Sequence, residues 1–144
     1  MLRVVFDTVV FVRSLINPCS FWGKIILKYS KSYRLFVSKP VLQEILEVLN
    51  RPEITSLFHS LEGLDKEKII EIVNQAEKVE IFDIPTTSRD IEDDKFLATA
   101  KAANAHFLIT ADKDLLDLKE YEKIKIINAE TFIEILKELE WEWK

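Results

Sequence analysis

The chain has 144 residues, of which 48% are apolar, and a net charge of −5. This length suits one domain, residues 1–144, with a substantial core, and the charge lacks the basic footprint of proteins that bind nucleic acid mainly through salt-dependent contacts. Two glycines are too few for the glycine-rich loops that bind nucleotide phosphates, so those nucleotide-binding folds are excluded.

The first half of the chain alternates apolar runs with amphipathic segments. Leu2–Phe6 is a β-branched apolar run typical of a strand buried on both faces, and Asp7 ends it. The elements expected next are a helix over Val9–Ile16, a helix over Phe21–Tyr33, a strand over Leu35–Ser38 and a helix from Pro40 to about Asn50.

The second half continues this alternation. The elements expected first are helices over Pro52–Leu61 and Asp65–Lys78 (capped by Asp65), a strand over Val79–Ile84 and a loop over Pro85–Asp90. A helix then runs from Asp93 or a neighbour to Ala103, followed by a strand over His106–Thr110 and a helix over Asp114–Leu118. The last two elements are a strand over Lys123–Ile127 and a helix from the cap Asn128 to about Glu140. Strands that alternate with helices predict a mostly parallel sheet between two helical layers.

Acidic side chains follow two of the expected strands at the point where each strand ends. Asp7 follows the first strand, and Asp112 follows the strand that ends in Thr110. Ligands of open parallel sheets bind beyond the carboxyl ends of the strands. If these two strands are neighbours, both carboxylates therefore lie on one rim of the sheet.

Three other acids are candidates for the same rim. Asp93 and Asp94 begin the helix before the second of these strands, and Glu44 lies beside the apolar stripe of the Pro40 helix. Several carboxylates in one crevice repel one another unless a cation such as Mg²⁺ or Mn²⁺ neutralises them, and such a metal can activate water for phosphodiester hydrolysis. Spacing alone does not bring these acids together, and the alternative interpretation is surface charge or, for Asp93, a helix cap.

Four stretches, in order over nearly the whole chain, carry a family resemblance. They are FDTVVFVRSL, SKPVLQEILEVLNRPEI, RDIEDDKFLATAKAANAHFLITADKDLLDL and IKIINAETFIEIL. The chain resembles the PIN-domain family, and in particular its branch of toxin components of toxin–antitoxin pairs, the VapC-like ribonucleases. The resemblance implies a three-layer α/β/α domain with a central parallel sheet of about five strands. It also implies an acidic, Mg²⁺- or Mn²⁺-dependent site that cuts single-stranded RNA.

The resemblance assigns particular acids to this site. Its catalytic acids would be Asp7, Glu44, Asp93 and Asp112, and the three aspartates would bind the metal. The third acid is a question of register, because counting back from Ala100 favours Asp93, whereas counting back from Asp112 allows Asp94. The accessory residues would be Asp94, Asp114 and Thr110, whose hydroxyl can orient a carboxylate or a water molecule.

Position 9 departs from the family pattern. The family commonly has Asp-Thr-Asn at its first acid, and this chain has Asp7-Thr8-Val9. Loss of an outer contact of a metal site typically costs about 10–100-fold in affinity or activity, so we expect activity to be reduced but retained. The alternative is a non-catalytic PIN-like module that binds RNA or a protein. A phosphoacceptor receiver domain is disfavoured because no lysine follows the last strand in the expected place.

Partners and location are expectations of the same kind. Arg13, Lys24 and Lys28 are candidate RNA contacts, although such side chains more often form the solvated face of a helix. Related toxins are commonly homodimers that a small antitoxin inhibits, which implies both partners here. One cysteine, an N-terminus without signal-peptide layout and no apolar run of about 20 residues predict a cytoplasmic protein without a membrane span.

Overall fold

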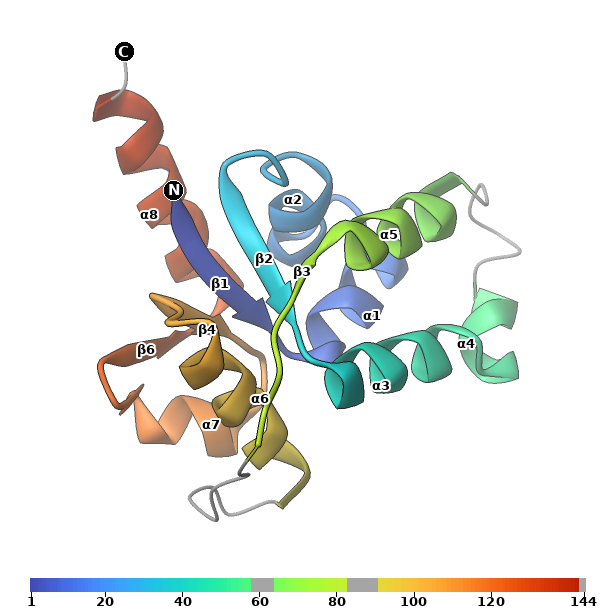
Figure 1. Ribbon diagram of the computed structural model, residues 1–144. Coiled ribbons are helices and arrows are strands. Elements are labelled where there is room, and N and C mark those ends of the chain that lie inside the picture. Colours follow the sequence, from blue (N-terminus) through green and yellow to red (C-terminus); the bar gives the residue numbers. More distant parts are fainter. Residues whose placement is uncertain (58–63, 83–90, 143–144) are drawn as a thin grey trace.

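The computed structural model describes residues 1–57, 64–82 and 91–142 (Figure 1). Its six-stranded sheet has the order β3-β2-β1-β4-β6-β5, in which the first five strands are parallel and β5 is antiparallel to β6. The strands are β1 (Leu2–Phe6), β2 (Tyr33–Val37), β3 (Glu77–Lys78), β4 (Phe107–Ile109), β5 (Glu120–Tyr121) and β6 (Ile124–Ile127). The predicted central sheet of about five parallel strands is confirmed, with one short antiparallel strand added at its edge.

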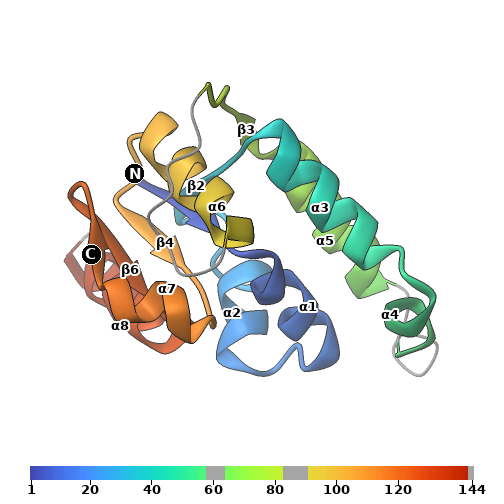
Figure 2. The ribbon, with the colours of Figure 1, turned by 90° about the horizontal axis from the view of Figure 1, so that it is seen from below.

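Helices cover both faces of the sheet. They are α1 (Thr8–Ile16), α2 (Phe21–Leu27), α3 (Lys39–Leu49), α4 (Pro52–Leu57), α5 (Leu64–Gln75), α6 (Ile91–Ala102), α7 (Lys113–Leu118) and α8 (Ala129–Glu142). Helix α6 packs against β1, β2 and β4 on one face, and α1, α2 and α8 pack together on the other (Figure 2). Helices α3, α4 and α5 extend beyond the β3 edge (Figure 1). The expected three-layer α/β/α architecture is therefore present.

The core is centred on strand β1. Val4, Val5 and Phe6 are almost fully buried, as expected of a strand covered on both faces. The ring of Phe6 lies 5.3 Å from that of Tyr33 and 6.2 Å from that of Phe132, which joins α8 to the sheet. Each large apolar side chain buried in this way contributes roughly 1.5–3 kcal/mol relative to an exposed one. This core fixes the end of β1, where Asp7 follows.

Several expected elements are wrong in their extent, among them the helix expected over Asp65–Lys78, which ends at Gln75. The helix expected over Phe21–Tyr33 ends at Leu27, because Tyr33 belongs to β2, where its buried hydroxyl donates to the carbonyl of Ile25 at 2.7 Å. The strand expected over Val79–Ile84 is found at Glu77–Lys78, since its partner β2 ends at Val37 and offers no backbone beyond that point. Residues 83–90, which include the expected loop, lie outside the described residues.

Helix ends also differ from the sequence prediction. Helix α6 begins at Ile91, so Asp93 lies inside its first turn rather than at its cap, and α5 begins at Leu64, one residue before the expected cap Asp65. The expected cap Asn128 is confirmed, because its side chain accepts from the Thr131 amide at 2.9 Å. In the described part of the chain no single helix is long and apolar enough to cross a membrane. Only α1 and α2, bent by 102°, reach that length and composition together.

Candidate functional site

The four acids predicted to form the site line one pocket of about 360 Å³. Asp7, Glu44, Asp93 and Asp112 come from the ends of β1 and β4, from α3 and from α6. The described remainder of the wall consists of Thr8, Val9, Val12, Val48, Arg51, Ile54 and Phe96. Strands β1 and β4 are neighbours, so the rim expected for Asp7 and Asp112 exists. The pocket thus brings together acids that are up to 105 positions apart, from 7 to 112.

Asp7 and Asp112 each terminate a strand and begin a helix. The Asp7 carboxylate accepts from the Val9 amide at 3.3 Å as the N-cap of α1, and its own amide donates to the carbonyl of Ile109 on β4 at 3.0 Å. Asp112 is the N-cap of α7 and accepts from the Asp114 amide at 2.8 Å. The helix-cap role that the sequence suggested for Asp93 therefore belongs to these two acids, which are held rigidly by it.

Asp93 reaches the pocket because of the direction of α6. The helix precedes β4 and packs antiparallel to it, so its first turn lies at the carboxyl ends of the strands (Figure 1). Asp93 is 6% exposed and lines the pocket, whereas Asp94 is buried and is not among the pocket's described lining residues. A carboxylate in the first helical turn is also stabilised by the helix dipole. This geometry favours Asp93 over Asp94 as the third acid.

Thr110 connects the two strand-end acids. Its fully buried hydroxyl donates to Oδ2 of Asp7 at 2.6 Å and accepts from the backbone amide of Asp112 at 2.9 Å. The Thr110 hydroxyl thus holds the Asp7 carboxylate beside the Asp112 amide, and its accessory role in a reaction stays a prediction. Asp114, a second predicted accessory acid, donates its backbone amide to Asp112 and is not among the described residues that line the pocket.

Glu44 is held by two donors from elsewhere in the chain. The Thr8 hydroxyl donates to its Oε2 atom, and the Lys95 ammonium group forms an ion pair with its Oε1 atom. Lys95 was not predicted as a site residue. It stands two positions after Asp93 in the sequence, a spacing that gives no periodic signal, and only the fold brings it to α3. Arg51, which lines the pocket and pairs with Glu47 at 3.4 Å, was also not predicted, because a basic residue just after a helix gives no signal of a site.

The pocket destabilises the charged form of Asp7. Burial is the largest cause that raises the pKa of the Asp7 carboxyl above its ordinary value, and the charges of Asp112 and Glu44 raise it further. The Thr110 hydroxyl and the Val9 amide oppose this rise in the pKa. A cation in the pocket would relieve the same repulsion and desolvation.

The donor chemistry of the pocket fits a hard divalent cation. Among the residues that the structure describes, no three His, Cys, Asp or Glu side chains are close enough to hold a metal ion as they stand. Mg²⁺ retains several waters and is commonly bound through only one or two carboxylates, so a Mg²⁺ ion in this pocket would bind the aspartates partly through water molecules. Asp7, Asp93 and Asp112 are the residues that would hold it, because Glu44 already accepts from Thr8 and Lys95.

The three basic residues predicted as RNA contacts lie apart from the pocket wall. Arg13, Lys24 and Lys28 are exposed, and their charged groups lie 5.4, 5.8 and 5.3 Å from the ring centres of Trp22, Phe21 and Tyr29, respectively. Cation–π contacts of this kind occur widely on protein surfaces. An RNA contact by these residues stays a prediction.

The fold and the acidic pocket define a class of protein, and comparison with known families identifies it. Residues 3–114 match the model of the PIN domain family, so the chain belongs to this family. PIN domains are generally nucleases and typically depend on divalent metals.

One relative and one solved structure extend this comparison. The chain is 31% identical over 132 residues to an uncharacterized protein, MJ1680, of Methanocaldococcus jannaschii, covering 88% of this chain and 81% of the relative. The crystal structure of PAE2754 from Pyrobaculum aerophilum superposes with a TM-score of 0.56, covers 94% of this chain and 90% of that chain, and is 14% identical in sequence. At that identity the second likeness supports the fold alone.

Proposed function

We propose that the protein is a Mg²⁺- or Mn²⁺-dependent endoribonuclease that hydrolyses phosphodiester bonds of single-stranded RNA. The observation that carries this proposal is the convergence of Asp7, Glu44, Asp93 and Asp112 on one pocket at the carboxyl ends of β1 and β4. Family membership supports the nuclease class.

The chain's own residues would prepare the pocket for hydrolysis. When bound, the metal supplies a water that is easier to deprotonate and positive charge for the phosphate oxygens. Thr110 and the helix caps of α1 and α7 fix Asp7 and Asp112 before the substrate arrives, which is the preorganisation that electrostatic catalysis requires. Water oxygen adds to phosphorus, the bond to the leaving oxygen breaks, and that oxygen takes up a proton.

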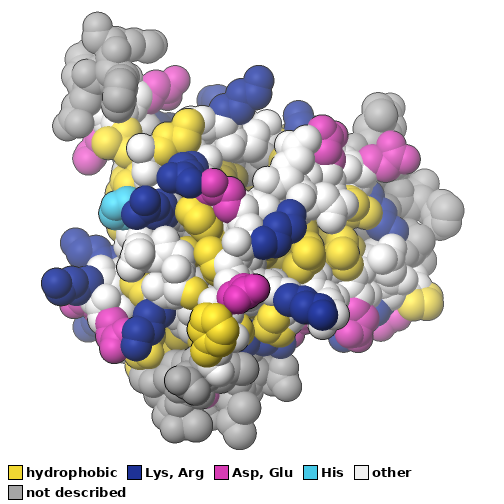
Figure 3. Space-filling model, in the orientation of Figure 1, with side chains coloured by type: hydrophobic (Ala, Val, Ile, Leu, Met, Phe, Trp, Pro, Cys, Tyr) yellow, Lys and Arg dark blue, Asp and Glu magenta, His cyan; other side chains and the backbone are white. Residues whose placement is uncertain are grey.

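Among the residues that the structure describes, Arg51 is the basic residue best placed to contact a substrate phosphate. It lines the pocket, and its ion pair with the exposed Glu47 lies on the surface. Such a pair contributes little free energy, so Arg51 can exchange Glu47 for a phosphate. Elsewhere, basic and acidic side chains are interspersed over the face in Figure 3. A chain of net charge −5 therefore needs local contacts such as Arg51, and we place Arg13, Lys24 and Lys28 as outer contacts of a longer RNA.

The decisive experiment combines Mn²⁺ calorimetry with cleavage of a fluorogenic single-stranded RNA. The wild type should bind Mn²⁺ and cleave, and Asp7→Asn should lose both properties. Asp117→Asn is the matched control, because Asp117 is an exposed acid of α7 outside the described pocket wall. Metal-dependent cleavage that Asp7→Asn leaves untouched would refute the proposed site.

We further propose that the protein is the toxin of a toxin–antitoxin pair, acts in the cytoplasm and forms a homodimer. Exposed apolar residues on α1 and at the start of α2 support a protein contact: Val9, Ile16 and Phe21 are 39–52% exposed, and Val9 lines the pocket. Induced expression should arrest growth of a bacterial or archaeal host, Asp7→Asn should not, and co-expression of a small neighbouring gene product should restore growth. Light scattering of the purified protein should give the mass of a dimer.

The second candidate function is a non-catalytic PIN-like module that binds RNA or a protein. It is favoured by Val9, an apolar residue that lines the pocket where the family commonly has asparagine. This candidate predicts that the folded wild type binds RNA without binding Mn²⁺ or cleaving. Val9→Asn should then restore Mn²⁺ binding, which the catalytic proposal does not require.

A further inference from the structure

Lys95 brings a positive charge to the edge of the acidic pocket. Its ammonium group pairs with Oε1 of Glu44, while the Thr8 hydroxyl donates to Oε2 of the same carboxylate. Helices α3 and α6, which carry the two partners, contact each other. Both oxygens of Glu44 are therefore engaged by the chain itself, although Glu44 faces the same pocket as three aspartates.

This ion pair differs from the others in the described part of the chain. The side chains of Lys95 and Glu44 are 15% and 26% exposed, whereas those of Lys101 and Glu122 are 60% and 50% exposed. Exposed pairs contribute little to stability, and removing one partner of a more buried pair leaves an uncompensated charge. Lys95 lies where such a charge matters most, next to an acidic cluster.

We propose that Lys95 is a positioning residue that supplies a resident positive charge to the pocket and confines the divalent ion to the aspartates. It holds Glu44 through Oε1, so the pocket takes one divalent ion on the side of Asp7, Asp93 and Asp112, and the lysine occupies the place of a second cation. This inference rests on the proposed metal-dependent function. It goes beyond that function by fixing the number of metal ions at one and by giving Glu44 a partner other than metal.

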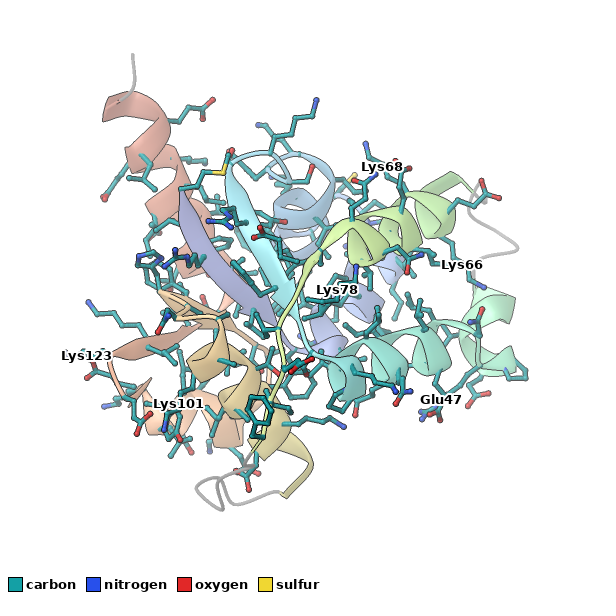
Figure 4. All side chains as sticks on the ribbon, in the orientation of Figure 1. Glu47, Lys66, Lys68, Lys78, Lys101 and Lys123 are labelled. Carbon is teal, nitrogen blue, oxygen red and sulfur yellow. The ribbon has the colours of Figure 1, made fainter. Side chains whose placement is uncertain are left out.

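The experiment counts bound Mn²⁺ and measures melting temperatures with and without Mn²⁺. The wild type should bind one ion per chain. Lys95→Met should bind a second ion, because Glu44 then has no cation, and added Mn²⁺ should raise its melting temperature more than that of the wild type. Lys95→Arg, which keeps the charge, should bind one ion. Lys101→Met is the matched control, since Lys101 lies on the same helix in an exposed pair at the periphery (Figure 4), and should behave as the wild type.

A double variant keeps the proposal testable if Lys95→Met folds poorly. Lys95→Met combined with Glu44→Gln removes both charges, so it should bind one ion as the wild type does. The proposal is overturned if Lys95→Met binds one ion with a wild-type Mn²⁺ response, or if the double variant binds two. One bound ion in the wild type and two in Lys95→Met, without RNA cleavage by the wild type, would refute the ribonuclease function and support the role of Lys95. A wild type that binds no Mn²⁺ would refute both.

Discussion

Replacement of Thr110 by valine tests whether the contact between the two strand-end acids prepares the metal site. Valine has nearly the shape of threonine, so the change removes a buried hydroxyl without leaving a cavity. The hydroxyl donates to Asp7 Oδ2 at 2.6 Å and accepts from the Asp112 amide at 2.9 Å. Thr110→Val therefore removes one hydrogen bond to a carboxylate and leaves one backbone donor without this acceptor.

The structure sets the expected size of the effect. A hydrogen bond to a charged group contributes about 1.5–3 kcal/mol, and a buried donor left unsatisfied costs about 1–3 kcal/mol. The two contributions add to roughly 2.5–6 kcal/mol. The Asp112 amide is only partly buried, so we expect a loss of stability near the lower end of this sum, about 3 kcal/mol. For a chain of this size that corresponds to a fall in melting temperature of roughly 6–12 °C. Because the Thr110 bond lowers the pKa of Asp7, its loss should raise that pKa further and weaken Mn²⁺ binding.

Urea unfolding and Mn²⁺ calorimetry on the same samples separate the two consequences. Thr99→Val is the matched control, because Thr99 is another fully buried threonine whose hydroxyl bonds the carbonyl of Lys95 and the hydroxyl of Ser38, each at 2.7 Å. Both variants should lose stability, but only Thr110→Val should lose about 10–100-fold in Mn²⁺ affinity. Equal Mn²⁺ affinity in the two variants would refute the idea that Thr110 prepares the site.

Three other predictions follow from the pocket. Burial raises the pKa of Asp7 above its ordinary value of 3.8, so the folded chain binds this proton more tightly than the unfolded chain. The resulting stability is present below a pH of about 4 and is lost as the pH rises through the folded pKa, so Asp7→Asn should raise the metal-free melting temperature at pH 7 and flatten its dependence on pH. Val9→Asn should increase kcat/KM by up to about 10–100-fold, and an unchanged value would show that no amide contact is missing. Arg51→Ala should raise KM for RNA several-fold, leave kcat nearly constant and reduce the salt dependence of KM; a loss confined to kcat would contradict a phosphate contact.

The fold was largely predictable because the strands β1, β2, β4 and β6 are short, mostly apolar runs. Leu2–Phe6 matches β1 residue for residue, and the alternation with helices gave the parallel sheet. Sequence patterns failed where a distant partner sets the boundary. Tyr33 fits a helical pattern but packs in β2, and β3 is confined to Glu77–Lys78 because only the end of β2 is available to pair with it. A two-residue strand such as β5 has no pattern long enough to recognise.

The residues of the candidate site also fall into two groups, those that the sequence predicts and those that only the fold brings together. Asp7 and Asp112 could be expected on one rim from the strands that they follow, whereas Glu44 and Asp93 were assigned through the family resemblance and needed the topology to reach the pocket. The contact between Lys95 and Glu44 joins residues 51 positions apart on two helices, and nothing in the local sequence of either helix indicates it. The side chains that pair with the acids of a site are thus harder to predict from the sequence than the acids themselves, because packing between elements determines these pairs.

These partners explain how an acidic pocket can persist before metal binds. Thr110 and two helix caps hold the strand-end carboxylates, and Lys95 forms an ion pair with Glu44. Each contact offsets part of the repulsion between the carboxylates. A bound cation would offset the repulsion that remains. A ligand that binds only the folded state at 100 times its dissociation constant adds about 2.7 kcal/mol of stability. Mn²⁺ should therefore raise the melting temperature of the wild type strongly. A variant in which any one of the three aspartates is replaced by asparagine should lose this stabilisation by Mn²⁺.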